Sequence, residues 1–241
     1  MEKKQEVLVI IPAYNEEKRI ASVIRGVRDR VPQAEVVIVD DGSHDKTRWA
    51  AIEAGAKVLS HPINLGYGAA LQTGYKFALD KGFESIVQMD GDGQHDPSFL
   101  PILLEGIQRG DADYVIGSRF LKTGSTILAG EIYPAPFIRR LGMRVFGTIT
   151  SLIIRQKITD STSGYQAMNH RVLEWVSSDQ FPWDYPDADV IIMLHRAGFH
   201  IREVPVRMFP SENKKSMHSG WKPIYYVFKM FLSILVTLMR K

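Results

Sequence analysis

The residues best suited to chemistry lie in one short segment, Gln88-Met89-Asp90-Gly91-Asp92-Gly93-Gln94-His95-Asp96. It follows an apolar run at 83–87 that predicts a buried strand, and its glycines allow a tight turn. Asp90 and Asp92 place two carboxylates one residue apart at the end of that strand. Hard divalent cations prefer oxygen ligands, and Mg²⁺ often combines one or two carboxylates with substrate phosphates. The segment therefore predicts a Mg²⁺ or Mn²⁺ site, with a merely solvated turn as the alternative.

A calcium-binding EF-hand loop would use such a segment differently, and the sequence excludes it. That loop requires glycine and glutamate at positions where the chain has His95 and Pro101. Pro97 lies just beyond the turn, where it suits the first turn of a helix.

The composition indicates a globular protein of one large domain, or one domain with an appendage. The chain has 241 residues, 45% of them hydrophobic, and a net charge of +3. Acidic residues gather near 40–45, 80–96 and 184–189, and basic residues near 139–157 and 202–215. This pattern predicts a metal or nucleotide site beside an anion-attracting surface, with no nucleic-acid partner. The absence of cysteine excludes disulfides, and the charged residues at 1–6 predict no signal peptide.

Strands alternate with helices over the first half, which predicts an α/β fold with a mostly parallel sheet. The predicted strands are 7–11, 36–39, 57–60, 84–89, 114–117 and 201–206. The predicted helices begin near 15–17 and 68 and cover 45–54, 99–108, 170–177 and 190–197. The segment at 160–165 is predicted to be a polar turn.

Three polar motifs directly follow predicted parallel strands. They are Pro12-Ala13-Tyr14-Asn15-Glu16, Asp40-Asp41-Gly42-Ser43 and Asp90-Gly91-Asp92. Ligands bind outside the carboxyl ends of such strands, so the motifs are expected to share one crevice. A dinucleotide-binding loop is the competing interpretation, because Gly66-Tyr67-Gly68 begins a G-x-G pattern. It fails at Leu71, where a third glycine is required, and it follows the third strand instead of the first.

The segment 137–157 is basic and amphipathic, which suits an anionic membrane surface or lipid headgroup. It carries Arg139, Arg140, Arg144 and Arg155 among apolar residues. An ordinary surface helix with a solvated arginine face is the alternative.

The C-terminal segment 224–239 is apolar except for Lys229, Ser233 and Thr237, whose spacing of four predicts one narrow polar stripe on a helix. The run is short for a bilayer crossing. We expect a helix in the membrane plane, or one that docks on a membrane partner or second subunit, with packing on its own domain as the alternative. The predicted domains are 1–210, with the catalytic fold, and 211–241, with a basic loop and an interfacial helix.

In sequence order, several motifs together resemble glycosyltransferase family 2, and within it the dolichyl- or polyprenyl-phosphate sugar synthases. The resemblance covers about residues 6–208 and rests on 9–17, 39–43, 64–68, 88–92, 117–119, 160–165 and 203–206. It implies a GT-A fold with a nucleotide-binding α/β sheet, a divalent cation held by an Asp-x-Asp motif, and inversion at the anomeric carbon.

The resemblance also implies roles for individual residues. Those of the nucleotide-sugar site would be Pro12, Ala13, Tyr14, Glu16, Asp40, Asp41, Asn64, Gly66, Asp90, Gly91 and Gln94. Asp90 and Asp92 would hold the cation, and Asp41 would read the base. The catalytic carboxylates would be Asp187, Asp189 and Asp92. The acceptor phosphate would meet Arg119, Arg139, Arg140, Ser163, Lys214 and Lys215. Lys214 or Lys215 would replace the arginine that many relatives carry in a loop after the last strand.

The sequence thus predicts a metal-dependent inverting glycosyltransferase, peripheral on the cytoplasmic face of the membrane. It would move a sugar from a GDP- or UDP-linked donor to a polyprenyl phosphate. A saccharide or lipid-linked saccharide is the alternative acceptor. A non-catalytic nucleotide-sugar-binding subunit of a membrane complex is the alternative function. A second copy of the chain or a small membrane protein is a further predicted partner.

Overall fold

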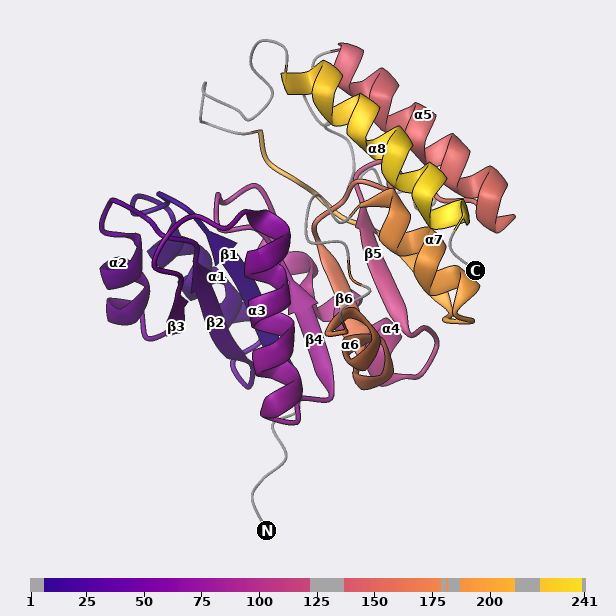
Figure 1. Ribbon diagram of the computed structural model, residues 1–241. Coiled ribbons are helices and arrows are strands. Elements are labelled where there is room, and N and C mark those ends of the chain that lie inside the picture. Colours follow the sequence, from indigo (N-terminus) through magenta and orange to yellow (C-terminus); the bar gives the residue numbers. More distant parts are fainter. Residues whose placement is uncertain (1–6, 122–136, 179–180, 182–186, 211–221, 240–241) are drawn as a thin grey trace.

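The computed structural model describes residues 7–121, 137–178, 181, 187–210 and 222–239, which form an α/β fold around one sheet (Figure 1). The strands are β1 Val7–Ala13, β2 Glu35–Asp40, β3 Lys57–Ser60, β4 Ser85–Gln88, β5 Tyr114–Ser118, β6 Gln166–Asn169 and β7 Ile201–Pro205. The helices are α1 Ile20–Arg30, α2 Thr47–Glu53, α3 Tyr67–Asp80, the 3₁₀ turn η1 Pro97–Phe99, α4 Leu100–Gln108, α5 Phe137–Ile154, α6 His170–Val176, α7 Ala188–Arg196 and α8 Lys222–Met239.

The strand order is β3-β2-β1-β4-β6-β5-β7. β1, β2, β3 and β4 pair in parallel, as do β5 and β7, whereas β6 runs antiparallel to both β4 and β5. The mostly parallel sheet and all six predicted strands are confirmed, with ends shifted by at most two residues. β6 is the strand that the sequence analysis missed, since it placed only a turn and a helix there.

Successive side chains of β1 point to opposite faces of the sheet, as strand geometry requires. Val9 and Ile11 join a core with α1, α2 and α4, while Leu8 and Ile10 join a second core with α3, α6 and α7. All seven β1 residues are buried. A strand that is covered on both faces needs apolar side chains at every position, and β1 has such a continuous apolar run. The helix predicted to begin near 15–17 begins at Ile20, because Asn15 has a left-handed φ of 58°.

The helices α5, α7 and α8 lie together at the end of the molecule that carries β5 and β7 (Figure 1). α7 packs against both of the others, and the rings of Phe146 and Phe231 lie 5.2 Å apart between α5 and α8. Among the described residues, no helix combines the length and hydropathy that a bilayer crossing requires.

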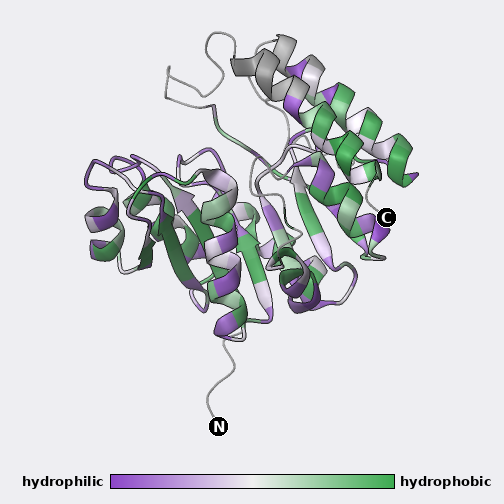
Figure 2. Cartoon of the chain, in the orientation of Figure 1, coloured by the Kyte–Doolittle hydropathy of each residue, from purple (hydrophilic) through white to green (hydrophobic). Residues whose placement is uncertain are grey.

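The polar stripe of α8 faces the rest of the domain. The Ser233 hydroxyl donates to Asp189, and Arg196 donates to the carbonyl oxygen of Thr237 at 2.7 Å. The opposite side of α8, which we call the α8 outer face, is apolar and exposed (Figure 2). It consists of Phe231, Leu232, Leu235, Val236, Leu238 and Met239. α8 therefore packs on its own domain through these polar contacts and through the buried side chains of Met230 and Ile234, while the residues of the α8 outer face stay exposed.

Candidate active site

The carboxyl ends of β1, β2 and β4 meet at one edge of the sheet, as the motif spacing predicted. The backbone N–H of Asp41 donates to the carbonyl of Ala13 at 2.9 Å, which joins the ends of β2 and β1. Gly91, after β4, approaches β1 so closely that an added Cβ would lie 3.2 Å from the carbonyl oxygen of Pro12. Three motifs far apart in the sequence therefore form one site.

Asp90 is held by two neighbouring side chains. Its Oδ1 accepts a hydrogen bond from the Tyr67 hydroxyl at 3.0 Å, and its backbone N–H donates to Nδ1 of His95 at 3.0 Å. The His95 ring stacks on Tyr165, with centroids 4.7 Å apart. Burial lowers the pKa of His95 to about 4, so the ring is neutral at pH 7 and Nδ1 is free to accept.

Asp92 lies in the tight turn that follows, where Gly93 has a left-handed φ of 78°. Its Oδ1 accepts from the backbone N–H of Gln94 at 2.9 Å, and the Gln94 side-chain amide donates to Oδ2. The carbonyl oxygen of Gln94 in turn accepts from the Phe209 N–H at 2.7 Å, which ties the turn to the segment after β7. The turn is thus fixed in place by backbone contacts.

The donor set of this turn fits a divalent cation that arrives with a phosphate ligand. Asp90 and Asp92 offer carboxylate oxygens, which Mg²⁺ and Mn²⁺ prefer. Within the described residues, no cluster of three or more His, Asp or Glu side chains forms a complete metal cage. Two carboxylates and a diphosphate are the usual arrangement for Mg²⁺, which rarely uses an all-protein cage.

Asp41 shapes the loop that leads into α3. Its carboxylate is buried and accepts from the N–H groups of Leu65 and Gly66, each at 2.9 Å. His61 Nδ1 lies 2.7 Å from the same carboxylate. This loop carries Asn64 and Gly66, two of the predicted nucleotide-binding positions. Since both Asp41 oxygens already bind the chain, its contact with a base stays a prediction.

The residues predicted to line the base and ribose surround the end of β1. Tyr14 is 42% exposed, with its ring edge-on to His44 at 6.3 Å. Glu16 accepts from Arg19 Nη1 at 3.1 Å, and burial raises the pKa of its carboxyl although Arg19 opposes the shift. Asp40 is buried and accepts from the backbone N–H of Ser43 at 3.2 Å. Tyr14 is therefore the residue of this group whose ring is open to a ligand.

The predicted acceptor-phosphate residues Arg119 and Ser163 both hold the loop 159–165. The Arg119 guanidinium makes two hydrogen bonds to Asp160, at 2.6 and 2.7 Å, and the Arg119 side chain is only 6% exposed. The Ser163 hydroxyl donates to the carbonyl of Gly117 at 2.6 Å. Asp160 already neutralises the Arg119 guanidinium, which the sequence analysis did not foresee. A contact of either residue with a phosphate stays a prediction.

The other predicted acceptor residues are less defined. Arg140 is half-buried near the start of α5. The side chain of Arg139, and Lys214 and Lys215 altogether, lie outside the described residues.

The two predicted catalytic carboxylates of α7 have different surroundings. Asp189 is buried, and its oxygens accept from Ser233 and from the N–H groups of Asp187 and Val190. Burial raises its pKa. Asp187 is half-exposed at the start of α7. Burial raises the pKa of Tyr67, and the charges of Asp90 and Asp187 raise it further. Asp189 therefore joins α7 to α8, and Asp187 is the carboxylate at the start of α7 whose charge acts on Tyr67.

Some residues of the site were not assigned a role from the sequence. They are Tyr67, His95, Asp160, Gly164 and Glu203. Each lies inside or beside a motif recognised in the sequence, and this position was the signal that could have identified it. The residue that each contacts in the site lies in another segment of the chain, which the sequence alone does not reveal. Glu203 accepts from the N–H groups of Thr159 and Asp160 at 2.8 Å, for example, so β7 fixes the same loop as Arg119.

Comparison with curated proteins gives relatives over most of the chain. Undecaprenyl-phosphate mannosyltransferase of Micrococcus luteus is 32% identical over 222 residues, which cover 89% of this chain and 88% of the relative. UDP-N-acetylglucosamine–dolichyl-phosphate N-acetylglucosaminyltransferase of Methanococcus voltae is 30% identical, with 98% and 97% covered. Polyprenol monophosphomannose synthase of Mycolicibacterium smegmatis is 31% identical, with 90% and 82% covered.

Solved structures share the fold. Glucosyl-3-phosphoglycerate synthase from Mycobacterium tuberculosis, in complex with Mn²⁺ and UDP-glucose, superposes with a TM-score of 0.65 at 22% identity. The alignment covers 96% of this chain and 78% of that one. The sequence profile of Glycosyl transferase family 2 matches residues 8–176. The chain therefore belongs to Glycosyl transferase family 2 and is a glycosyltransferase with the GT-A fold.

Proposed function

We propose that this chain is a metal-dependent, inverting hexosyltransferase that moves a sugar from a nucleotide sugar to a polyprenyl phosphate. The observation that carries the proposal is the acceptor class that the names of the relatives share. Two relatives are named for transferring mannose and one for N-acetylglucosamine, yet all are named for a polyprenyl or dolichyl lipid. Because the sugars differ, either a GDP-linked or a UDP-linked donor is compatible with the proposal.

The site residues suit a single displacement. An oxygen of the lipid phosphate forms the new bond to the anomeric carbon, while the bond to the leaving diphosphate breaks and that group keeps the electron pair. The cation held by Asp90 and Asp92 would stabilise the charge on the leaving diphosphate. A lipid phosphate is already anionic at pH 7, since its second pKa is about 6, so no general base is required. Asp187 would then orient the acceptor.

The α8 outer face supports a location at the membrane surface. Six large apolar side chains exposed on one side of one helix are unusual for a surface in water. Arg144 on the neighbouring helix α5 and Arg155 directly after its end are exposed, and such cations attract anionic headgroups. We propose that this side of the molecule rests on the inner face of the membrane, near the polyprenyl phosphate.

A transfer assay tests the proposed function. Purified protein with Mn²⁺ receives radiolabelled GDP-mannose, UDP-glucose or UDP-N-acetylglucosamine, with undecaprenyl or dolichyl phosphate in detergent. We expect label from one donor to move into the organic phase, and none when EDTA removes the cation. Nucleotide release without organic-phase label would contradict the proposed acceptor and direct the search to saccharides.

Introducing negative charges on the α8 outer face tests the membrane contact. Leu232 and Leu235 together supply about 3 kcal/mol or more if buried in lipid, so Leu232→Glu/Leu235→Glu weakens vesicle binding at least about a hundredfold. Sedimentation with phosphatidylcholine–phosphatidylglycerol vesicles measures this. Ile52→Glu, at an exposed apolar position on α2, is the matched control and keeps full binding. Equal sedimentation of both variants would contradict the membrane contact.

A further inference from the structure

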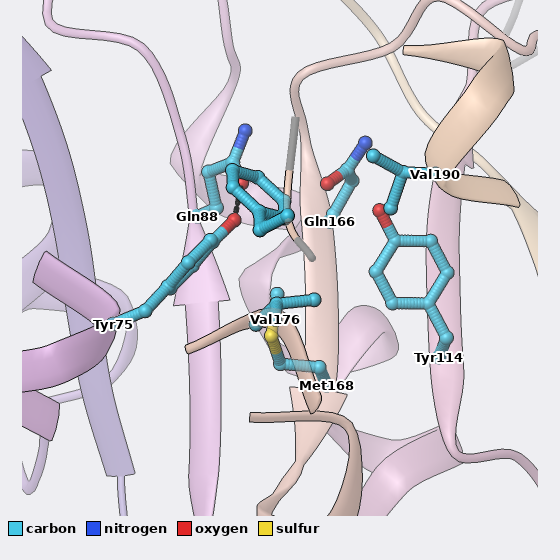
Figure 3. Close-up of a pocket in the computed structure, with 8 residues that line it drawn as sticks. Tyr75, Gln88, Tyr114, Gln166, Met168, Val176 and Val190 are labelled. Atoms are coloured by element: carbon cyan, nitrogen blue, oxygen red, sulfur yellow. Dashed lines mark hydrogen bonds between the residues drawn. The ribbon is translucent and has the colours of Figure 1, made fainter. Parts of the chain in front are cut away.

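Asp90 lies at the end of a series of side-chain hydrogen bonds that begins on α3. The Tyr75 hydroxyl donates to Oε1 of Gln88, and Nε2 of Gln88 donates to the Tyr67 hydroxyl at 3.0 Å. The Tyr67 hydroxyl then donates to Oδ1 of Asp90 at 3.0 Å. Figure 3 shows the first link, where Tyr75 reaches across from α3 to Gln88 at the end of β4.

The hydrogen bonds of the series all run from Tyr75 toward Asp90, and each residue orients the side chain that accepts its hydrogen bond. Tyr67 and Tyr75 are eight residues apart, so both lie on the face of α3 that packs on the sheet. Tyr75 takes up the amide oxygen of Gln88, which turns the amide NH₂ toward Tyr67. Because Tyr67 accepts that bond, its single proton is directed to Asp90. The buried end of the series therefore determines which way the Tyr67 proton points.

Gly164 lies close to both partners of the hydrogen bond from Tyr67 to Asp90. A Cβ on Gly164 would lie 2.9 Å from the Tyr67 hydroxyl oxygen and 3.3 Å from both carboxylate oxygens of Asp90. The φ of Gly164 is not in the left-handed region, so the close approach, and not backbone conformation, is what requires glycine here. The ion pair of Arg119 with Asp160 and the contacts of Glu203 hold this loop in place. The hydrogen bond from Tyr67 to Asp90 thus lies against a loop position that has no room for a side chain.

We propose that Tyr67, oriented by Gln88 and Tyr75, is a positioning residue that fixes the Asp90 carboxylate for the cation. Tyr67 donates to Oδ1 of Asp90, Nε2 of His95 lies 3.6 Å from Oδ2, and Gly164 leaves no room for a side chain beside them. Groups that hydrogen-bond to metal-ligating carboxylates orient them, and their loss weakens metal binding. The inference rests on the proposed role of Asp90 and Asp92 in holding the cation.

The test measures metal affinity separately from activity. Mn²⁺ binding is titrated by electron paramagnetic resonance in the presence of GDP or UDP, well below the melting temperature. Tyr67→Phe keeps the ring and removes only the hydroxyl, and it is expected to weaken Mn²⁺ binding by about ten- to hundredfold. Turnover at saturating Mn²⁺ recovers most of the wild-type value, so the change lies in the Mn²⁺ concentration that gives half-maximal activity. A structural role alone would lower the melting temperature and leave this concentration unchanged.

Matched variants distinguish the effect of the hydrogen-bonded series on Mn²⁺ binding from the effect of the residues around it. Tyr75→Phe, at the far end, is expected to weaken Mn²⁺ binding in the same sense but less. Tyr114→Phe removes a buried hydroxyl that lies in the same region as Tyr75 and Gln88 but outside the series, and it leaves Mn²⁺ binding unchanged (Figure 3). Gly164→Ala is expected to weaken binding by displacing Asp90. Its control is Gly142→Ala, because a Cβ on Gly142 meets nothing within 4 Å.

Two results would overturn the inference, and Asp92→Asn distinguishes them. If Tyr67→Phe binds Mn²⁺ as the wild type does while Asp92→Asn binds it weakly, the metal site stands and Tyr67 does not position it. If Asp92→Asn also binds Mn²⁺ with wild-type affinity, the proposed metal site itself is wrong, and the role of Tyr67 falls with it.

Discussion

Asp92→Asn is expected to reduce turnover by about a thousandfold while leaving the fold intact, because the variant removes one anionic ligand of the cation at the leaving diphosphate. Asparagine has nearly the same shape, and its oxygen still accepts from the backbone N–H of Gln94. The melting temperature should therefore stay close to that of the wild type. The transfer assay described above, run over a range of Mn²⁺ concentrations, measures the loss.

Asp80→Asn is the matched control for Asp92→Asn. It removes the same charge from the exposed end of α3, where Asp80 pairs with the neighbouring Lys81. We expect its turnover to equal that of the wild type. Full activity of Asp92→Asn at every Mn²⁺ concentration would show that Asp92 does not ligate the cation.

Arg119→Met is expected to destabilise the protein by about 3 to 5 kcal/mol, because it leaves the Asp160 charge buried without its partner. The Asp160 side chain is 0% exposed and binds Arg119 through two hydrogen bonds. For a chain of this size the loss corresponds to a fall in melting temperature on the order of 10 °C. Thermal unfolding followed by circular dichroism measures it.

Two further variants test the origin of that effect. Arg171→Met breaks an ion pair with Asp113 in which the Arg171 side chain is 72% exposed, so its cost should stay below about 1 kcal/mol. Arg119→Met/Asp160→Asn removes both charges and should recover part of the stability. If the double variant is stable but inactive with a polyprenyl phosphate, Arg119 also has a role toward the acceptor. Unchanged melting of Arg119→Met would contradict the structural role.

The location of the site could be predicted from the sequence because its strands and turns are recognisable from short segments of the chain. β1, β2 and β4 are apolar runs that end in polar motifs, and parallel strands place such ends at one edge. Asp90 and Asp92 could thus be assigned to the same site as Tyr14 without any structural information. The end of β2 was well defined, since Asp41 and Gly42 follow it, whereas β1 continues through Pro12 to Ala13.

β6 could not be found in this way. Gln166–Asn169 has only four residues, with polar residues at both ends, so it lacks the alternation of a half-buried strand. Gln166 is nevertheless buried, and its amide donates to the carbonyl of Ser163 at 2.6 Å. The strand exists because β4 and β5 offer edges on both sides, and those edges come from distant segments.

The orientation of α8 was decided by tertiary contacts in the same way. The spacing of Lys229, Ser233 and Thr237 correctly indicated a polar stripe, but a stripe does not reveal which side faces the protein. Asp189 on α7 accepts from Ser233 of the stripe, and Met230 and Ile234 pack into the core beside it, so the α8 outer face is the side left exposed. α8 thus packs on its own domain, which was the alternative interpretation of the sequence. It also presents an exposed apolar surface, and contact of that surface with a membrane stays a prediction.

By itself, the sequence determined the α/β class, six of the seven strands and the edge of the sheet where the carboxylates gather, because these depend on hydrophobic periodicity and turn residues close together in the chain. The tertiary structure alone decided the partners of those carboxylates. It placed Tyr67 and Gly164 against Asp90, Asp160 against Arg119, and Asp189 against α8. Such contacts join residues tens of positions apart, and their hydrogen bonds depend on distances of a few ångströms that only the packed fold defines.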